Sequence, residues 1–369
     1  MRYHDLHLQR VGLAVGAERQ LTSEALADGR YSPREAARTG QVSRAAAPGW
    51  TGPALATVAG HRALGGTDRS AVALHLHATI NDSGHDFWAP NCGVASDLGL
   101  RGGMTLEIGA MSNSLCLGME LAASTLSAWR DASALVTAGD VFAPPRFDPW
   151  SADVGMVYGD AGAAYTLGRT PGLARLLASA TSSDPRLERL NRGVSQPYAN
   201  AVVRPPIELG AHKRAAAGEL GGTAEVDRRN GVCVAEAVAG ALDDAEVTLG
   251  DVAAVFAPHY GQLLLQRHVL SPLGVGSSDR TGADYGAEVG HLGAADQIAA
   301  LHRWCSQGRL DPGDVVLLLG IGVGMTHTAI LVEITDPAAL HPDSAAPHNP
   351  APAGETAVPA PAVPWEVSA

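Results

Sequence analysis

The chain has 369 residues, of which 46% are hydrophobic, so it can bury a large core as two domains or as one large duplicated unit. Its formal net charge of −12 argues against a nucleic-acid partner. Four widely spaced cysteines without metal-ligand spacing argue against a zinc site and a disulfide framework. Because the sequence shows neither a signal-peptide core nor an apolar run of membrane-spanning length, we expect a cytoplasmic protein that does not enter a membrane.

Strand and helix patterns alternate along the chain. In the first half, apolar runs predict strands at residues 11–17, 70–80, 104–111, 133–142 and 161–168. Helical periodicity lies between them, at 53–66, 91–100 and 114–129. The second half repeats the rhythm, with strands at 173–182, 252–261, 314–324 and 326–335 and helices at 231–245, 262–275 and 293–308. This alternation predicts an α/β fold whose sheets are covered on both faces.

Segments of the two halves resemble each other in the same order, which indicates an internal duplication. In both "HDFWAPNCGVASDLGL" and "HYGQLLLQRHVLSPLGV", a His-aromatic loop precedes a helix that ends in Leu-Gly. We therefore assign residues 1–172 to the first half and 173–335 to the second. The tail, 336–369, is rich in Pro and Ala and aperiodic, so we expect it to be disordered.

The stretch "TLEIGAMSNSLCLGMELAAS" contains the first candidate for chemistry. An alternating run becomes a helical pattern at Ser112, and several enzyme folds present a nucleophile at such a junction. A helix N-terminus there would stabilise negative charge. Alternatively, Ser112 is an ordinary helix N-cap. Ala110 and Ser114 replace the glycines of the G-x-S-x-G elbow, which disfavours an α/β-hydrolase.

Two later loops offer a general base. His259 follows an apolar strand in "FAPHYGQ", and His291 lies in "GAEVGHLGAADQ", five residues before Asp296. A carboxylate near an imidazole fixes its tautomer and stabilises the imidazolium. Either histidine could instead have a purely structural role, and Asp296 could simply favour the first turn of its helix. In "LLLGIGVGMTHT", one of the three glycines Gly320, Gly322 and Gly324 could direct an N–H group at an oxyanion, or the segment could be a tight turn between paired strands.

These pieces follow the order of one family. Over residues 10–335 the chain resembles the β-ketoacyl-acyl-carrier-protein synthase III family of the thiolase superfamily. "ARTGQVSR" at 37–44, "GHDFWAPNC" at 84–92 and "YGDAGAAYTLG" at 158–168 are similar to further motifs of that family. The resemblance implies a thiolase-like α/β fold, in which two pseudo-duplicated βαβαβαββ halves form a five-layered αβαβα sandwich.

The departures from the family pattern fit together chemically. The family's nucleophile is a Cys, and Ser112 stands at the matching position, while Cys116 should face packing. His259 matches the family's first His, whereas His291 replaces the family's Asn. A Ser hydroxyl requires a general base that a Cys thiol does not, and His291 with Asp296 would supply one. The combination resembles the Ser-type starter-unit synthases of anthracycline polyketide pathways, the daunorubicin and aclacinomycin type.

The resemblance implies a starter-unit condensation in aromatic polyketide biosynthesis. His291, oriented by Asp296, would take the Ser112 proton as Ser112 attacks a short acyl-CoA, with propionyl-CoA expected. The N–H groups of Ser112 and Gly324 would hold the oxyanion. Malonyl-carrier protein would then lose CO2, and its carbanion would attack the acyl-Ser ester while His259 and His291 stabilise the enolate.

Two alternatives remain open at the level of sequence. An oxygen ester is a poorer acyl donor to a carbanion than a thioester. The protein could therefore be an acyltransferase, which passes the group to a carrier thiol or to a hydroxyl or amine of a natural product without condensation. It could also be an inactive thiolase-fold partner subunit, although a dead site need not acquire a base.

The resemblance also implies partners and further contacts. We expect acyl-CoA as a substrate, no other cofactor, no metal, an acyl carrier protein as partner, and a homodimer. The expected substrate-binding residues are Arg38, Phe87, Trp88 and Leu115.

Overall fold

The computed structural model describes residues 1–81, 83–85, 87–194, 206–322 and 324–340. The first half contains the strands β1 (His7–Val15), β2 (Glu18–Leu21), β3 (Ser43–Ala46), β4 (Val72–Ala78), β5 (Met104–Glu107), β6 (Ser133–Asp140) and β7 (Ala161–Gly168). Its helices are α1 (Thr22–Ala27), α2 (Pro33–Thr39), α3 (Gly52–Leu64), α4 (Pro90–Asp97) and α5 (Ser114–Ala128).

The second half contains the strands β8 (Ala174–Ser183), β9 (Val252–Phe256), β10 (Val315–Gly322) and β11 (Thr326–Ile334). Its longer helices are α7 (Leu209–Glu219), α8 (Thr223–Ala245), α11 (Ala283–Val289) and α12 (Asp296–Ser306). Shorter helical segments are α6 (Arg189–Arg192), α9 (Gln262–Leu265) and α10 (Ser271–Leu273).

The two halves share one strand order. In the first half β4, β6, β7 and β1 are neighbours in that order, and in the second half β9, β10, β11 and β8 are. In each half the first of these pairs is parallel and the next two are antiparallel. β1 and β8 join the halves through the pairs His7↔Arg175 and Leu8↔Ala174. The predicted boundary at 172/173 falls in the connection from β7 to β8.

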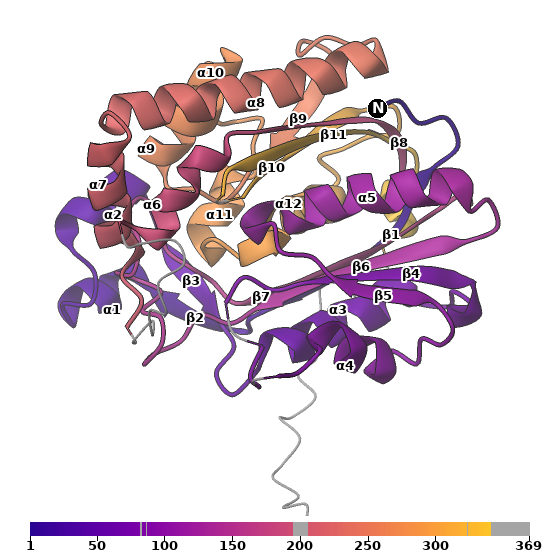
Figure 1. Ribbon diagram of the computed structural model, residues 1–369, viewed down its shortest axis with the longest axis horizontal. Helices are drawn as coiled ribbons and strands as arrows, with labels where there is room; N and C mark the ends of the chain where they lie inside the picture. The colour runs from indigo at the N-terminus through magenta and orange to yellow at the C-terminus, as the bar shows by residue number, and fades with distance from the viewer. Residues whose placement is uncertain (82, 86, 195–205, 323, 341–369) are drawn as a thin grey trace, which may run out of the picture.

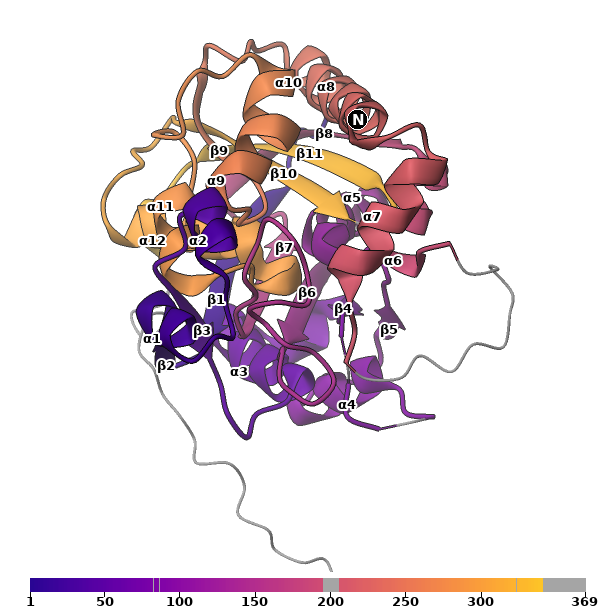
Figure 2. The same cartoon turned by 90° about the vertical axis from the view of Figure 1, so that its left-hand side faces the viewer.

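Figure 1 shows the five layers of the fold. Helices α5 and α12 lie in the middle, between the sheet of the first half below and the sheet of the second half above. Helices α3 and α4 cover the lower sheet, and α8 covers the upper one; Figure 2 gives the same arrangement from the side. The central helices pack into the largest apolar core of the molecule. The predicted thiolase-like fold is confirmed.

Small residues allow helix α3 to lie directly on the first sheet. A Cβ atom on Gly12 of β1 would stand 2.0 Å from the Ala59 carbonyl oxygen, and one on Gly139 of β6 would stand 2.0 Å from that of Gly52. Because real Cβ atoms do not approach so closely, these positions require glycine. Because the strands and helix α3 touch through their backbones, the helix lies unusually close to the sheet.

The structure refines several predicted elements. The strand predicted at 104–111 ends at Glu107, and the following residues turn toward α5. The helix predicted at 262–275 contains a π-helical stretch, Gln266–Leu270, between α9 and α10. The sequence did not indicate α7 or α11. Most of the tail predicted to be disordered, 341–369, lies outside the described residues, and the part that precedes it contains the short 3-10 turn Pro337–Ala339.

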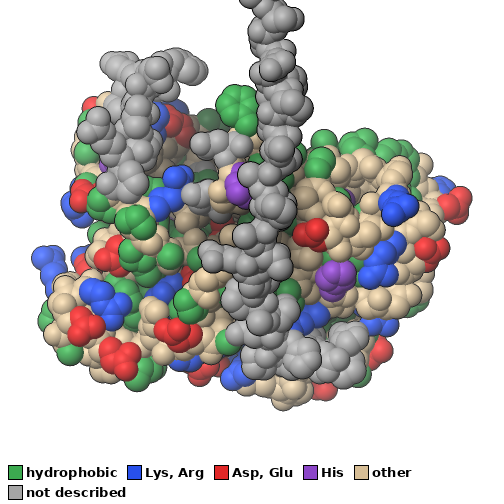
Figure 3. Space-filling view, turned by 90° about the horizontal axis from the view of Figure 1, so that it is seen from below, with side chains coloured by type: hydrophobic (Ala, Val, Ile, Leu, Met, Phe, Trp, Pro, Cys, Tyr) green, Lys and Arg blue, Asp and Glu red, His purple; other side chains and the backbone are tan. Residues whose placement is uncertain are grey.

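No helix within the described residues has both the length and the apolar character needed to cross a membrane. On the face seen from below, basic and acidic side chains are interspersed rather than separated by sign (Figure 3).

Two buried histidines lie side by side on β4. His75 contacts the Thr105 and Thr137 hydroxyls at 2.8 and 3.0 Å, and His77 contacts Thr137 at 2.9 Å. The His77 Nε2 atom has no hydrogen-bond partner among the described residues. Burial lowers the pKa of His75 to about 4, and burial together with the charge of His75 lowers the pKa of His77 to about 3. Both imidazoles are therefore neutral in the folded protein at neutral pH.

We expect this pair to make the fold acid-sensitive. The unfolded chain, where a histidine has its ordinary pKa near ~6.5, takes up protons that the folded chain does not, so stability falls as pH drops below that value. At pH 5 each of the two should cost about 2 kcal/mol of unfolding free energy relative to pH 7. The measurement is urea unfolding at both pH values for the wild type and His77→Asn, which keeps a donor at the position of Nδ1. The pH effect should shrink in His77→Asn and stay unchanged in His4→Asn, an exposed control; equal pH effects in all three would contradict it.

Candidate active site

Ser112 stands on a strained turn between β5 and α5. The 3-10 turn Met111–Asn113 begins with Met111 at φ +52°, a left-handed conformation that costs a non-glycine residue about 1 kcal/mol or more. The Ser114 hydroxyl accepts a hydrogen bond from the Ala110 N–H at 3.0 Å and so ties the turn together. The Ser112 hydroxyl contacts His291, and the N-cap residue of α5 is Asn113, which argues against the N-cap interpretation.

The turn packs closely against two glycines of β10. A Cβ atom on Gly322 would stand 2.0 Å from the Ala110 carbonyl oxygen, and one on Gly320 would stand 2.0 Å from Asn113 Oδ1. Two of the three glycines singled out in the sequence are therefore required by close packing against the turn. The third, Gly324, has φ +118° and lies in the connection to β11. Its neighbour Met325 lines the same cavity as Ser112.

A fully buried carboxylate, that of Asp296, organises the second half of the site. Asp296 is the first residue of α12 and accepts hydrogen bonds from the Leu292 N–H and the His259 N–H, both at 2.7 Å. It also accepts a bond from His291 Nδ1 at 2.5 Å, and His259 Nδ1 lies 3.1 Å from its other oxygen. A buried carboxylate must be satisfied by such donors because the interior does not solvate it.

Ser112, His291 and Asp296 form a continuous hydrogen-bonded line. His291 Nε2 lies 2.8 Å from Ser112 Oγ, and its Nδ1 faces Asp296. Since a carboxylate only accepts, the hydrogen of the neutral ring is on Nδ1 and Nε2 presents a lone pair to the hydroxyl. All three side chains are buried. The arrangement is that of a serine activated by a general base that a carboxylate orients.

His259 shares the same carboxylate. Its Nδ1 lies 3.1 Å from the Gly290 carbonyl oxygen as well as 3.1 Å from Asp296 Oδ1, and both neighbours are acceptors. The hydrogen of the neutral ring is therefore again on Nδ1. Its buried Nε2 atom has no hydrogen-bond partner among the described residues.

The electrostatics of the site follow from burial and from this pairing. Burial alone would raise the pKa of Asp296, but the neighbouring His259 and His291 and their hydrogen bonds outweigh it and hold the pKa below its ordinary value. Burial lowers the pKa of His259 despite the carboxylate beside it. Burial also raises the pKa of the Cys116 thiol to about 12, so this cysteine, which packs in the core, is not a competing nucleophile.

A cavity of about 190 Å³ opens onto Ser112 and His291. Its wall is apolar near Met156, Leu264, Ile321 and Met325. Polar side chains also line it, among them Lys213, Asp227, Arg267 and His268. A small acyl group on Ser112 fits a cavity of this size and character.

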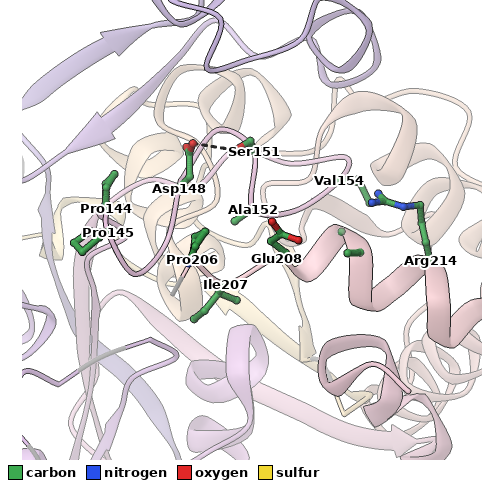
Figure 4. Close-up of a pocket in the computed structure, with 12 residues that line it drawn as sticks. Pro144, Pro145, Asp148, Ser151, Ala152, Val154, Pro206, Ile207, Glu208 and Arg214 are labelled. Carbon is green, nitrogen blue, oxygen red and sulfur yellow. Dashed lines mark hydrogen bonds between the residues drawn. The ribbon is translucent and has the colours of Figure 1, made fainter. Parts of the chain in front are cut away.

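A second cleft of about 500 Å³ adjoins this cavity. Figure 4 shows it between the loop that carries Asp148 and Ser151 and the start of α7. The side chain of Arg214 extends toward Val154, and these two residues line both spaces. The active-site cavity therefore borders on this cleft at Val154 and Arg214.

The four substrate-binding residues predicted from the sequence lie outside this cavity. Arg38 is exposed and pairs with Glu35 at 3.1 Å. Phe87 is fully exposed with φ +53°, and Trp88 beside it is 40% exposed. Leu115 is fully buried in the core. None of these four is among the described residues that line the cavity.

Sequence reasoning missed several cavity residues. Tyr260 directly follows His259, and Tyr158 opens the "YGDAGAAYTLG" motif, so a signal for both was present in the segments already singled out. Lys213 and Asp227 lie on α7 and α8, where no local pattern marks them.

The fold is of the thiolase type, and Ser112, just before the central helix α5, contacts His291, just before the central helix α12. The family model for the C-terminal part of 3-oxoacyl-acyl-carrier-protein synthase III matches residues 242–334. β-Ketoacyl-acyl-carrier-protein synthase III 2 of Streptomyces coelicolor is 29% identical over 293 residues, which cover 78% of this chain and 81% of the relative. The corresponding enzyme of Thermosynechococcus vestitus is 28% identical over 302 residues, 80% and 87% of the two chains.

Solved structures agree with these relatives. The structure of ChlB3, described as an acyltransferase, superposes with a TM-score of 0.85 at 30% identity and covers 91% of this chain and 99% of its own. The synthase III of Pseudomonas aeruginosa gives a TM-score of 0.72 at 21% identity, with 90% and 99% covered, and supports the fold. The chain belongs to the β-ketoacyl-acyl-carrier-protein synthase III-like family of the thiolase superfamily.

The geometry predicts that Ser112 is unusually reactive. A serine-directed phosphonofluoridate should label the wild type at Ser112, because His291 removes the hydroxyl proton during attack. His291→Ala should slow labelling by about 100-fold or more. Peptide mass mapping identifies the labelled residue. Ser127→Ala serves as the control, because the Ser127 hydroxyl bonds the Ala123 carbonyl within α5, and this variant should still be labelled at Ser112. Labelling that survives in Ser112→Ala would place the nucleophile elsewhere.

Proposed function

We propose that the protein is an acyltransferase that carries a short acyl group on Ser112. The observation that carries this proposal is the buried line Ser112–His291–Asp296, with contacts of 2.8 and 2.5 Å. The donor is an acyl thioester on CoA or on a carrier protein, and propionyl is the expected group. The proposed residues for this step are the ones expected from the sequence.

The geometry supports the following first half-reaction. His291 Nε2 takes the hydroxyl proton while Ser112 Oγ attacks the thioester carbonyl carbon. The N–H groups of Ser112 and Gly324 are the proposed oxyanion donors. The C–S bond then breaks, the imidazolium returns the proton to the leaving thiolate, and an acyl-Ser ester remains. Asp296 stabilises the imidazolium throughout.

The hydrogen-bond pattern of His259 favours a heteroatom acceptor. An enolate oxygen formed by decarboxylation requires a hydrogen-bond donor, yet His259 Nδ1 already faces two acceptors and Nε2 donates only when the ring is protonated. Burial lowers the pKa of His259, which favours the neutral ring. A neutral Nε2 can instead accept a proton from an incoming thiol, hydroxyl or amine. The acyl-Ser ester also favours such an acceptor, because an oxygen ester is a poor acyl donor to carbanions.

Condensation with malonyl-carrier protein is the second candidate. It is the reaction that the names of the Streptomyces and Thermosynechococcus relatives describe, whereas ChlB3 is described as an acyltransferase. The starter-unit role in aromatic polyketide biosynthesis belongs to this second candidate. Both candidates share the acyl-Ser112 intermediate and differ in the acceptor that collects the group.

Intact-protein mass spectrometry after mixing with propionyl-CoA tests the shared step. The wild type should gain one propionyl mass on Ser112, and Ser112→Ala should gain none. Asp296→Asn should acylate slower by about 10³- to 10⁴-fold, because the imidazole loses the partner that fixes its tautomer. A wild type that is acylated by neither propionyl-CoA nor a propionyl-carrier protein would overturn the proposal.

A chase of the acylated protein distinguishes the acceptors. A carrier protein with a free pantetheine thiol should remove the acyl group without CO2 release. Deacylation that requires malonyl-carrier protein and releases CO2 in equal amount would replace simple transfer by condensation.

A homodimer is part of the same proposal. Strand β5 is at the edge of the sheet, and Met104 and Leu106 on it are each 46% exposed. Phe87 and Leu121 add to the exposed apolar residues. An apolar edge strand is a ready site for pairing with a second chain.

Introduction of charge at this edge should disrupt the dimer. Met104→Lys together with Leu106→Lys is expected to convert the dimer to a monomer in sedimentation equilibrium, because like charges would face each other across the two chains. Arg10→Glu on β1 is a control at an interior strand of the sheet. A double variant that sediments as the wild type would refute this interface.

A further inference from the structure

A buried network of three side chains lies beside the base but outside the Ser112–His291–Asp296 line. The Tyr158 hydroxyl donates to Asp153 Oδ2 at 2.8 Å, and Lys213 Nζ donates to the same oxygen at 2.6 Å. The other Asp153 oxygen accepts the Val154 N–H at 2.8 Å. The Asp153 side chain is fully buried, and Lys213 is 20% exposed at the cavity wall.

Tyr158 connects this network to His291 through its ring and its backbone. The two rings meet edge to face, with centroids 5.1 Å apart and planes at 64°. The main chain pairs as a short parallel bridge, in which His291 N donates to Val157 O at 2.7 Å and Gly159 N donates to His291 O at 2.9 Å. The bridge fixes the position of the His291 backbone, and the Tyr158 ring packs against one side of the imidazole.

Tyr158 is not itself suited to proton transfer. Its hydroxyl proton is engaged by Asp153, and burial raises the pKa of Tyr158 well above its usual value, with the Asp153 charge adding to the effect. An aromatic ring alone would fill the same space, and what the hydroxyl adds is a fixed orientation.

We propose that Lys213, Asp153 and Tyr158 form a positioning network that holds the His291 imidazole in line with Ser112 and keeps the surrounding charge balanced. The proposal rests on the assignment of His291 as the base for Ser112. Tyr158 restrains rotation of the imidazole, Asp153 anchors Tyr158, and Lys213 neutralises Asp153. Lys213 comes from α7, 60 positions after Asp153, so the network also fixes a wall of the cavity to the base.

The charges of Lys213 and Asp153 should affect the protonation of His291, which a purely packing role would not do. The titratable groups that face or surround His291 are Asp296, His259, Tyr158, Tyr260 and Asp140. Loss of Lys213 would leave the Asp153 carboxylate unpaired in this buried region and would stabilise an imidazolium. Loss of the Asp153 charge would leave the Lys213 ammonium unpaired and would do the opposite.

Phosphonofluoridate labelling of Ser112 in the full chain is the readout, since it needs the base but no natural acyl donor. Tyr158→Phe should lower the maximal labelling rate by about 10- to 100-fold, with the apparent affinity for the reagent unchanged, because the imidazole is misplaced. Tyr31→Phe is the matched control, since the Tyr31 hydroxyl is also buried and bonds Thr39 at 2.7 Å, and Tyr31 is not among the described residues that line the cavity. Its labelling should equal that of the wild type.

The pH profile of labelling tests the charge balance. The low-pH limb of the rate should move to higher pH in Lys213→Met and to lower pH in Asp153→Asn, and it should return toward the wild-type position in the double variant. Melting temperatures of all variants identify any that do not fold, and the double variant provides the neutral comparison.

The outcomes separate this inference from the proposed function. Wild-type labelling kinetics in Tyr158→Phe, or an unmoved limb in both single charge variants, would overturn the network while Ser112 remains the nucleophile. An unlabelled wild type would overturn both at once. Normal labelling of Ser112 in a protein that accepts no acyl thioester would overturn the proposed function alone.

Discussion

The site depends on one buried carboxylate. Asp296 is fully enclosed, and a charge there is tolerated because two backbone N–H groups and two imidazoles satisfy its oxygens. These donors come from the segment after β9 and from the loop before α12. The carboxylate therefore does two things at once: it holds two loops together and sets the same tautomer on His259 and His291. Because both rings carry their hydrogen on Nδ1, both present a lone pair at Nε2.

The duplicated fold explains why Ser112 and His291, the proposed nucleophile and base, meet. Ser112 precedes the central helix α5, and His291 precedes the central helix α12, so each stands at the equivalent place in its own half. The 3-10 turns at the two helix starts pack against each other. The N-terminal ends of two buried helices thus converge on one point, where their free N–H groups favour negative charge. The glycines of β10 allow the first of these turns to come close enough.

Much of the fold and of the candidate site could be predicted from the sequence. Strands such as β7 and helices such as α5 have strong local patterns, and the order of short motifs located Ser112 and both histidines. The five-residue offset from His291 to Asp296 was ambiguous on a helix, but His291 lies in the preceding loop, where helical spacing does not apply. Lys213 and Asp153 were beyond local reasoning, because their contact joins segments 60 residues apart. Of the expected substrate-binding residues, Arg38 lies on the surface and Leu115 in the core, and neither is among the described residues that line the cavity.

The division of the site between the halves has a consequence for the nascent chain. The first half carries Ser112 and the second carries its base, and the hydrogen bond between them spans 179 positions. Until the later segment docks, Ser112 is a serine without a base, and it remains as unreactive as any alcohol in water. The proposed reactivity of Ser112 therefore requires both segments to be folded and docked, and a truncated or half-folded chain should not react with cellular thioesters.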